Sequence, residues 1–250
     1  IQVFGEGVFL LFSEEALQEW EKHSAGFIDS RLNSIINRYN EGNVGYLPVP
    51  TARFVALHTM SHLLIRQLSF ESGYSSGSIR ERIYAEEGQA GILIYTADSD
   101  SEGSLGGLVQ QGELHRLLPT IAAALDTASW CSNDPVCSEM ETQGVMGLNK
   151  ASCHSCTLIS ETSCTMNNLM LDRKLLLGDE KGNGLMSDVL NKIKSGPFFI
   201  ESKILMAELI AFVKLKNELC SNNPIPKRDK FIKFGFITER EGISGSKNAL

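Results

Sequence analysis

Five of the chain's six cysteines lie close together, in spacings typical of a metal site. They are Cys131, Cys137, Cys153, Cys156 and Cys164, in the stretches C-S-N-D-P-V-C, C-H-S-C and E-T-S-C. Zinc binds four soft thiolates in structural sites, and a two-residue spacer lets both sulfurs of a C-x-x-C turn face one ion. The spacing therefore predicts a tetrahedral zinc site. Such a site holds a segment in shape, and by itself it indicates no reaction.

Five thiols compete for four ligand positions. The simplest arrangement uses two pairs, Cys131 with Cys137 and Cys153 with Cys156, and leaves Cys164 as an alternate ligand. Two other interpretations stay open: a redox dithiol formed by the C-H-S-C pair, and cysteines that are merely buried.

Two histidines form a second candidate site. His58 and His62 are four residues apart in a predicted helix, which places both imidazoles on one face. The spacing matches the metalloprotease pattern H-E-x-x-H, but Thr59 replaces the glutamate that would act as general base. We therefore expect buried, hydrogen-bonded histidines, with a catalytic metal as the alternative. Arg66 extends the same face and indicates a polar network or an interface.

An acidic loop, D-S-D-S-E-G-S-L-G-G-L, carries Asp98, Asp100 and Glu102 at alternate positions. It begins like a calcium-binding EF loop, but the twelfth position, which needs a bidentate glutamate, is Val109. A magnesium site and a solvated acidic turn are the two interpretations. The loop lacks the Lys-Ser/Thr of a phosphate-binding loop, so nucleotide binding is disfavoured.

Two basic motifs are candidate contacts for DNA or for a partner protein. Arg80 and Arg82 flank Glu81 in S-I-R-E-R-I-Y, and the motif P-K-R-D-K-F-I-K-F interleaves phenylalanines with four cations. These four are Lys227, Arg228, Lys230 and Lys233. Cations beside aromatic rings suit phosphate and base contacts. A strand with a solvated basic face is the alternative.

Composition and charge narrow the class of protein. The 250 residues are 42% hydrophobic and 21% charged, as in ordinary soluble globular proteins. Residues 181–250 carry 12 Lys+Arg against 7 Asp+Glu, a net of +5, so the net of −7 leaves −12 for residues 1–180. An acidic body is a poor general binder of polyanions. Bunched cysteines favour a reducing, cytoplasmic setting, and the absence of a long apolar run argues against a membrane span.

The helices and strands expected around these residues indicate an α/β fold of mixed α+β type. It is a helix-rich domain with a small sheet and a four-cysteine zinc knot. Apolar runs predict strands over 5–12 and 91–96. Ser13 and Thr51 are predicted helix caps. Helices are expected over 27–39 and 114–129, and over 51–70, where apolar residues on more than one face predict a buried central helix.

Three segments are expected. Residues 1–47 form a strand and helix segment at the end of an upstream domain, 48–180 the zinc-binding domain, and 181–250 a helical, basic extension. The chain opens on Ile1 in an apolar run without an initiator methionine, which suggests that upstream sequence is missing.

Several of these phrases together resemble one family. Over roughly residues 48–178, the chain is similar to the MrfA-type zinc-binding (MZB) domain family. The stretches that carry the resemblance are H-T-M-S-H-L-L-I-R-Q-L-S-F-E-S-G-Y, S-I-R-E-R-I-Y, G-I-L-I-Y-T-A-D-S-D-S-E-G-S-L-G-G-L, C-S-N-D-P-V-C, C-H-S-C and E-T-S-C, followed by L-D-R. The resemblance is strongest to the DrmB branch, which belongs to the DISARM anti-phage system. Related domains carry a D-x-x-P-G-G-x-G loop, and this chain lacks its proline.

The resemblance implies that four cysteines hold zinc, which places the ligands at Cys131, Cys137, Cys153 and Cys156. It also implies a subunit that associates with the helicase of the same defence system and helps it to recognise or load DNA. Helicase and nucleotide-binding motifs are absent from the sequence, so we expect no enzyme. The competing hypothesis is a metal-dependent nuclease or hydrolase that uses Asp98, Asp100 and Glu102.

Overall fold

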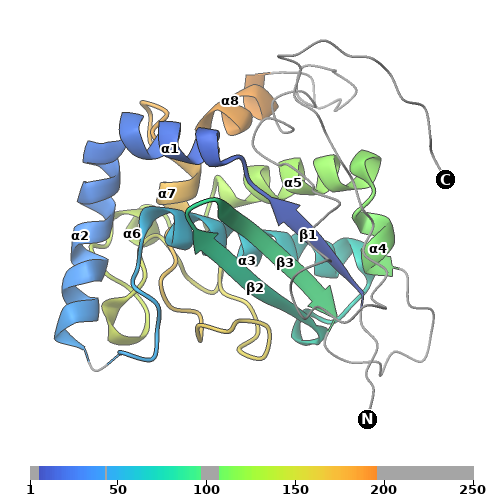
Figure 1. The fold of residues 1–250 in the computed structure, drawn as a ribbon, viewed down its shortest axis with the longest axis horizontal. Helices are drawn as coiled ribbons and strands as arrows, with labels where there is room; N and C mark the ends of the chain where they lie inside the picture. Colours follow the sequence, from blue (N-terminus) through green and yellow to red (C-terminus); the bar gives the residue numbers. More distant parts are fainter. Residues whose placement is uncertain (1–5, 43, 97–106, 196–250) are drawn as a thin grey trace.

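The computed structural model describes residues 6–42, 44–96 and 107–195, which form a three-stranded antiparallel sheet at one side of the molecule and a set of helices (Figure 1). The strands are β1 (Gly7–Leu11), β2 (Ile79–Glu86) and β3 (Gln89–Thr96). The longer helices are α1 (Glu14–His23), α2 (Ala25–Glu41), α3 (Ala52–Ser72), α5 (Leu114–Ala128) and α8 (Ser187–Ser195). Short turns of helix are η1 (Ser76–Ser78), α4 (Gly107–Gln111), α6 (Val136–Glu139), η2 (Val145–Gly147) and α7 (Arg173–Leu177).

The sheet has the order β1-β3-β2, so β2 lies at an edge. Val8 and Glu81 both pair with Ile94 of the central strand, from opposite sides. Along β2, Ile79 and Glu81 are buried while the arginines between and after them are exposed. Because side chains alternate between the faces of a strand, this register turns the Glu81 carboxylate towards the protein interior.

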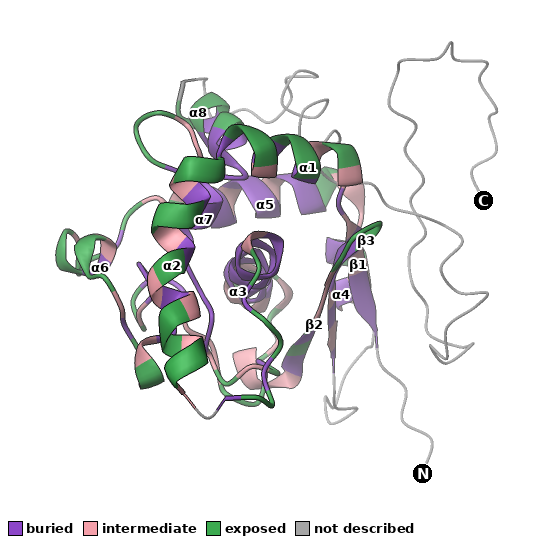
Figure 2. Cartoon of the chain, turned by 60° about the vertical axis from the view of Figure 1, so that its left-hand side comes forward, coloured by how far each residue is buried: buried purple, intermediate pink, exposed green. Residues whose placement is uncertain are grey.

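Helix α3 is the centre of the molecule. Its N-cap, Thr51, accepts a hydrogen bond from the Phe54 amide (3.2 Å), and Gly73 ends it in the left-handed conformation (φ 74°). The helix contacts α1, α4, α5, α7, β2 and β3, and Figure 2 shows it end-on as a buried rod inside the other elements. Apolar residues lie on several faces of the helix, so exposing any one of these faces to water would be unfavourable. This pattern explains why the helix is buried.

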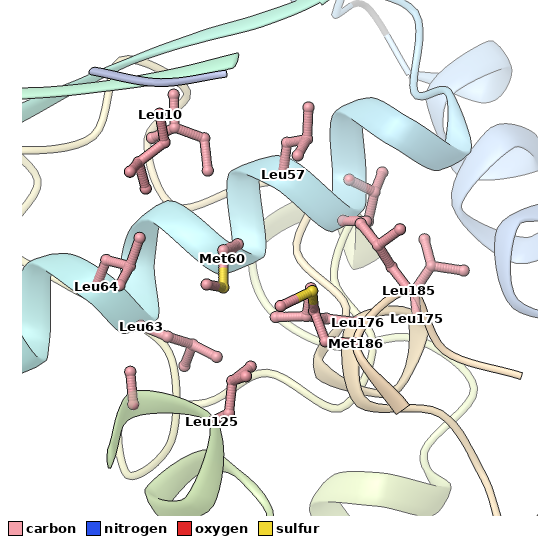
Figure 3. Packing of buried hydrophobic residues seen from close by; sticks show 14 of the residues in the cluster. Leu10, Leu57, Met60, Leu63, Leu64, Leu125, Leu175, Leu176, Leu185 and Met186 are labelled. Carbon is pink, nitrogen blue, oxygen red and sulfur yellow. The ribbon is translucent and has the colours of Figure 1, made fainter. Parts of the chain in front are cut away.

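The hydrophobic core is packed around α3 (Figure 3). Leu10 of β1 lies on one side of the helix, Leu125 of α5 on another, and Leu176 and Met186 on a third. All four side chains are buried. The core therefore joins segments that are far apart in sequence, and it fixes the sheet, α5 and α7 relative to one helix.

The sequence-based expectations of helices and strands are confirmed with small shifts at the ends. Ser13 caps α1 by accepting from the Ala16 amide (3.3 Å), and the predicted buried helix and the strand over 91–96 are α3 and β3. The α/β fold class with a small sheet and a cysteine cluster is confirmed. No helix in the described part of the chain is long and apolar enough to cross a membrane.

The three predicted segments share contacts. β1 pairs with β3, Trp20 donates a hydrogen bond from its ring nitrogen to the Asn183 carbonyl (2.9 Å), and Leu190 is part of the common core. The division at residues 47 and 180 stays a prediction.

We expect Leu64→Ala to destabilise the protein by about 2–5 kcal/mol, because Leu64 is fully buried on α3 and its loss leaves a cavity. Urea unfolding would measure the change. The control is Phe70→Ala on the same helix, whose side chain is 86% exposed and whose loss should change stability by less than about 0.5 kcal/mol. Equal effects of the two substitutions would contradict the central position of α3.

Candidate metal centre

Four of the clustered cysteines converge on one point. Cys131 follows the end of α5, Cys137 lies on α6, and Cys153 and Cys156 flank the C-H-S-C turn. Their Sγ atoms all lie within 4.8 Å of one another, with separations of 3.5 Å (131 to 153), 3.8 Å (137 to 156) and 3.7 Å (153 to 156). A tetrahedral zinc with Zn–S bonds near 2.3 Å has S···S edges of about 3.8 Å. The cluster fits one zinc ion.

Electrostatics in the cluster also favour a cation. Burial, together with the nearby Cys156 thiol, raises the pKa of Cys137, because thiolates close together repel one another. Burial also favours a raised pKa at Cys153. Hydrogen bonds from the Asn133 side chain (3.4 Å) and from groups next to Cys153 outweigh this effect and lower the pKa of Cys153 to about 6. A divalent ion would remove the repulsion and hold all four sulfurs as thiolates.

Hydrogen bonds shape the two halves of the cluster around the sulfurs. The Asn133 amide donates to Cys131 Sγ (3.4 Å), and the Cys153 amide donates to Cys156 Sγ (3.3 Å). Gln143 joins the halves, because its side-chain nitrogen donates to the Cys137 carbonyl while its Oε1 accepts from the Ser152 amide (3.1 Å). Bonds to ligand sulfurs and to ligand backbones orient a site before the metal binds.

Arg173 ties three segments together behind the cluster. Its side chain is buried, and Nη2 lies 2.8 and 2.9 Å from the two carboxylate oxygens of Asp134, in the C-S-N-D-P-V-C loop. Its Nη1 donates to the Ala128 carbonyl at the end of α5 (2.9 Å), and its Nε to the Ala151 carbonyl (3.4 Å). A buried guanidinium needs such complete pairing, so its position on α7 fixes where the cysteine loops lie.

Helix α3 holds the C-H-S-C turn from the other side. Arg66 Nη1 donates to the Leu158 carbonyl (3.0 Å) and Nη2 donates to the Ser155 carbonyl (3.1 Å). The predicted polar network at Arg66 is therefore confirmed, and it links the central helix directly to the turn between two of the cysteines.

The fifth cysteine lies elsewhere. Cys164 Sγ is 3.2 Å from His58 Nε2, in a separate buried group that also contains His62 and Glu81. The histidines are buried and hydrogen-bonded, as expected from the sequence. Glu81 was not singled out from the sequence, where it stands between the candidate contacts Arg80 and Arg82. The period of two along β2 was the signal that could have found it.

The remaining candidate residues fall into two groups. Arg80 and Arg82 are exposed on the edge strand β2. Seven candidates lie outside the described residues: Asp98, Asp100 and Glu102 of the acidic loop, and Lys227, Arg228, Lys230 and Lys233 of the basic motif. The sixth cysteine of the chain, Cys220, lies outside them as well.

Comparison with known proteins agrees with this geometry. The family described as MrfA Zn-binding domain matches residues 60–157, a span that includes all four converging cysteines. The DISARM protein DrmB of Bacillus paralicheniformis (strain ATCC 9945a / NCIMB 11709 / CD-2) is 41% identical over 180 residues. That alignment covers 71% of this chain but 32% of the relative, so the chain spans about a third of the relative's length. Residues 60–157 are thus an MrfA Zn-binding domain, in a zinc-binding chain related to DrmB.

Proposed function

We propose that the chain is part of a non-catalytic subunit of an anti-phage defence complex. In this proposal one zinc ion is held by Cys131, Cys137, Cys153 and Cys156. The subunit acts in the cytoplasm, associates with a DNA helicase of the same system and assists DNA recognition or loading. The similarity to a DISARM protein supports the defence role. The five free thiols among the described residues suit a reducing compartment.

The observation that carries the docking role is an exposed apolar surface on the zinc-binding loops. Val136 is 63% exposed and Met140 47% exposed, on and just after α6, and both line a hollow with Leu158 beside the cysteine cluster. Trp130, which precedes Cys131, is 70% exposed. Large apolar side chains exposed on a loop are typical of a protein-binding surface. Apolar surface in contact with water is unfavourable unless a partner covers it.

Zinc would supply rigidity to this surface. The metal would carry no reaction in this proposal, because four protein thiolates would fill its coordination and leave no position for water or substrate. In this proposal Arg173 and Arg66 fix the loops to α7 and α3, and the exposed apolar side chains form the binding surface. A binding surface held in one conformation loses less entropy on association.

DNA contact in this proposal uses basic residues away from the acidic body. Arg80 and Arg82 are exposed on the edge strand, and Lys227, Arg228, Lys230 and Lys233 extend the candidate set. Arginine and lysine neutralise phosphates, which supplies most of the sequence-independent affinity for DNA. The nuclease hypothesis gains no support from the two histidines, because both are fully buried and cannot offer an open metal position to a substrate.

Cys137→Ser should remove one equivalent of zinc per chain, because three thiolates and a hydroxyl bind zinc far more weakly than four thiolates. Elemental analysis of purified protein would measure the loss, and limited proteolysis should show faster cleavage between residues 131 and 157. Ser138→Ala, one position along on α6, should retain the full zinc content. Unchanged zinc in Cys137→Ser would contradict the proposed ligand set.

Val136→Asp combined with Met140→Asp should weaken association with the cognate helicase at least tenfold, since charges would enter an apolar interface. Co-purification and titration with the full-length proteins would measure this. Val49→Asp is the matched control, because Val49 is 65% exposed but lies away from the cysteine loops. No association of the unsubstituted protein with the helicase, or equal effects of both changes, would refute the docking surface.

Arg80→Glu combined with Arg82→Glu should reduce the DNA affinity of the full-length subunit. The slope of log affinity against log salt concentration should decrease in magnitude by about 2, the value for two lost phosphate contacts. Fluorescence anisotropy over a salt series would measure both. The control, Lys22→Glu with Lys181→Glu, makes the same change in net charge at two other exposed positions. If the control lowers the slope equally, the effect is one of overall charge and the assigned contacts are wrong.

A further inference from the structure

A second group of metal-ligating side chains lies buried, apart from the four-cysteine cluster. It consists of His58 and His62 from α3, Glu81 from β2 and Cys164 from the E-T-S-C loop. The first three are fully buried and Cys164 is 5% exposed. One potential ligand atom from each lies within 4.8 Å of all the others.

The separations suit four ligands around one ion. His58 Nε2 lies 3.0 Å from Glu81 Oε1 and 3.2 Å from Cys164 Sγ, and His62 Nε2 lies 3.4 Å from the same glutamate oxygen. Zinc bonds of about 2.0–2.1 Å to nitrogen or oxygen and 2.3 Å to sulfur give tetrahedral edges of roughly 3.3–3.6 Å. The 3.4 Å separation matches these edges, and the other two are within about 0.3 Å of them, so a small outward shift of the side chains would admit one cation.

The outer nitrogens of both rings have backbone partners. His58 Nδ1 lies 3.3 Å from the Met170 carbonyl, and His62 Nδ1 lies 3.1 Å from the Thr157 carbonyl. A carbonyl only accepts, so each Nδ1 carries the hydrogen and each neutral ring turns the lone pair of Nε2 inward. This is the usual outer contact of a metal-binding histidine, because it fixes the tautomer and the ring orientation.

The inner atoms are incompletely satisfied without an ion. His62 Nε2 is buried and makes no hydrogen bond, although Glu81 Oε1 is nearby. The other carboxylate oxygen of Glu81 accepts from the Ser61 hydroxyl. A buried ring nitrogen without a partner is costly, and here it points into the group of ligand atoms.

Cys164 has the surroundings of a thiolate. The Met166 and Asn168 amides both donate to its Sγ, each at 3.3 Å. Two amide donors on one sulfur stabilise negative charge, and single amides donate in the same way to Cys131 and Cys156 in the four-cysteine cluster.

Charge balance identifies the class of ion. Two neutral imidazoles, one thiolate and one carboxylate sum to −2, which a divalent cation neutralises in a site without water. Sulfur with two imidazole nitrogens selects zinc over the harder magnesium and calcium. The competing arrangement has no metal and holds both histidines protonated beside Glu81, whose carboxylate raises the pKa of His58 to about 10 against the effect of burial.

We propose that His58, His62, Glu81 and Cys164 form a second, closed zinc site, separate from the four-cysteine cluster. The ion would join three elements, α3, the edge strand β2 and the loop that follows the C-H-S-C turn. Because the protein supplies all four ligands and each is buried, the site is structural. The chain would therefore bind two zinc ions, one at each end of the segment 156–164.

Two measurements on the full-length protein, purified without chelator, test the site. Elemental analysis should give two zinc ions per chain, and zinc-edge X-ray absorption should give five sulfurs among eight ligands, with imidazole scattering. His62→Gln and Cys164→Ser should each leave one zinc bound by sulfur alone. His154→Gln, at an exposed histidine inside the C-H-S-C turn, should keep both ions.

One zinc per unsubstituted chain, with sulfur-only coordination, would overturn the second site and favour the protonated histidine pair. It would leave the four-cysteine site intact, so the two proposals fail separately. If His62→Gln does not fold, the absorption spectrum of the unsubstituted protein still decides the matter, because nitrogen ligands are expected only from the second site.

Discussion

The burial of helix α3 on every side over residues 53–65 is the constraint on which the structure depends. The helix carries two histidines, His58 and His62, into an interior where water cannot satisfy them, and the half-buried Arg66 extends the same face. A buried polar group without a partner costs on the order of 1–3 kcal/mol, so the surrounding chain must supply partners. The loops between residues 151 and 170 do so, through the carbonyls of Ser155, Thr157, Leu158 and Met170.

The same constraint places the cysteine cluster. Because Arg66 binds the C-H-S-C turn and Arg173 binds the C-S-N-D-P-V-C loop, the two halves of the cluster are held from α3 and α7, which pack against each other. The loops themselves contain little regular structure, and their own apolar core is small. Metal binding energy of on the order of 10 kcal/mol would then stabilise a region that packing alone stabilises poorly.

The sequence predicts the local features of this arrangement better than the long-range ones. Thiol spacing indicates the cysteine cluster but leaves Cys164 as an alternate ligand, and the family resemblance implies the four that converge. Caps identify the starts of α1 and α3, and apolar character on several faces identifies α3 as central. The environment of Cys164 could not be deduced, because its neighbours His58 and Glu81 are 106 and 83 residues away in the chain. Arg173 was likewise unrecognised, since a basic residue in L-D-R is expected to be solvated until the Asp134 carboxylate beside it is known.

The account is tested most directly by anomalous diffraction at the zinc absorption edge, on crystals of the protein prepared without chelators. It predicts a peak equidistant from the sulfurs of Cys131, Cys137, Cys153 and Cys156, and a second peak between His58, His62, Glu81 and Cys164. Disulfide bonds within the cysteine cluster, or the absence of a peak among its four sulfurs, would contradict the claim that metal organises the loops around α3.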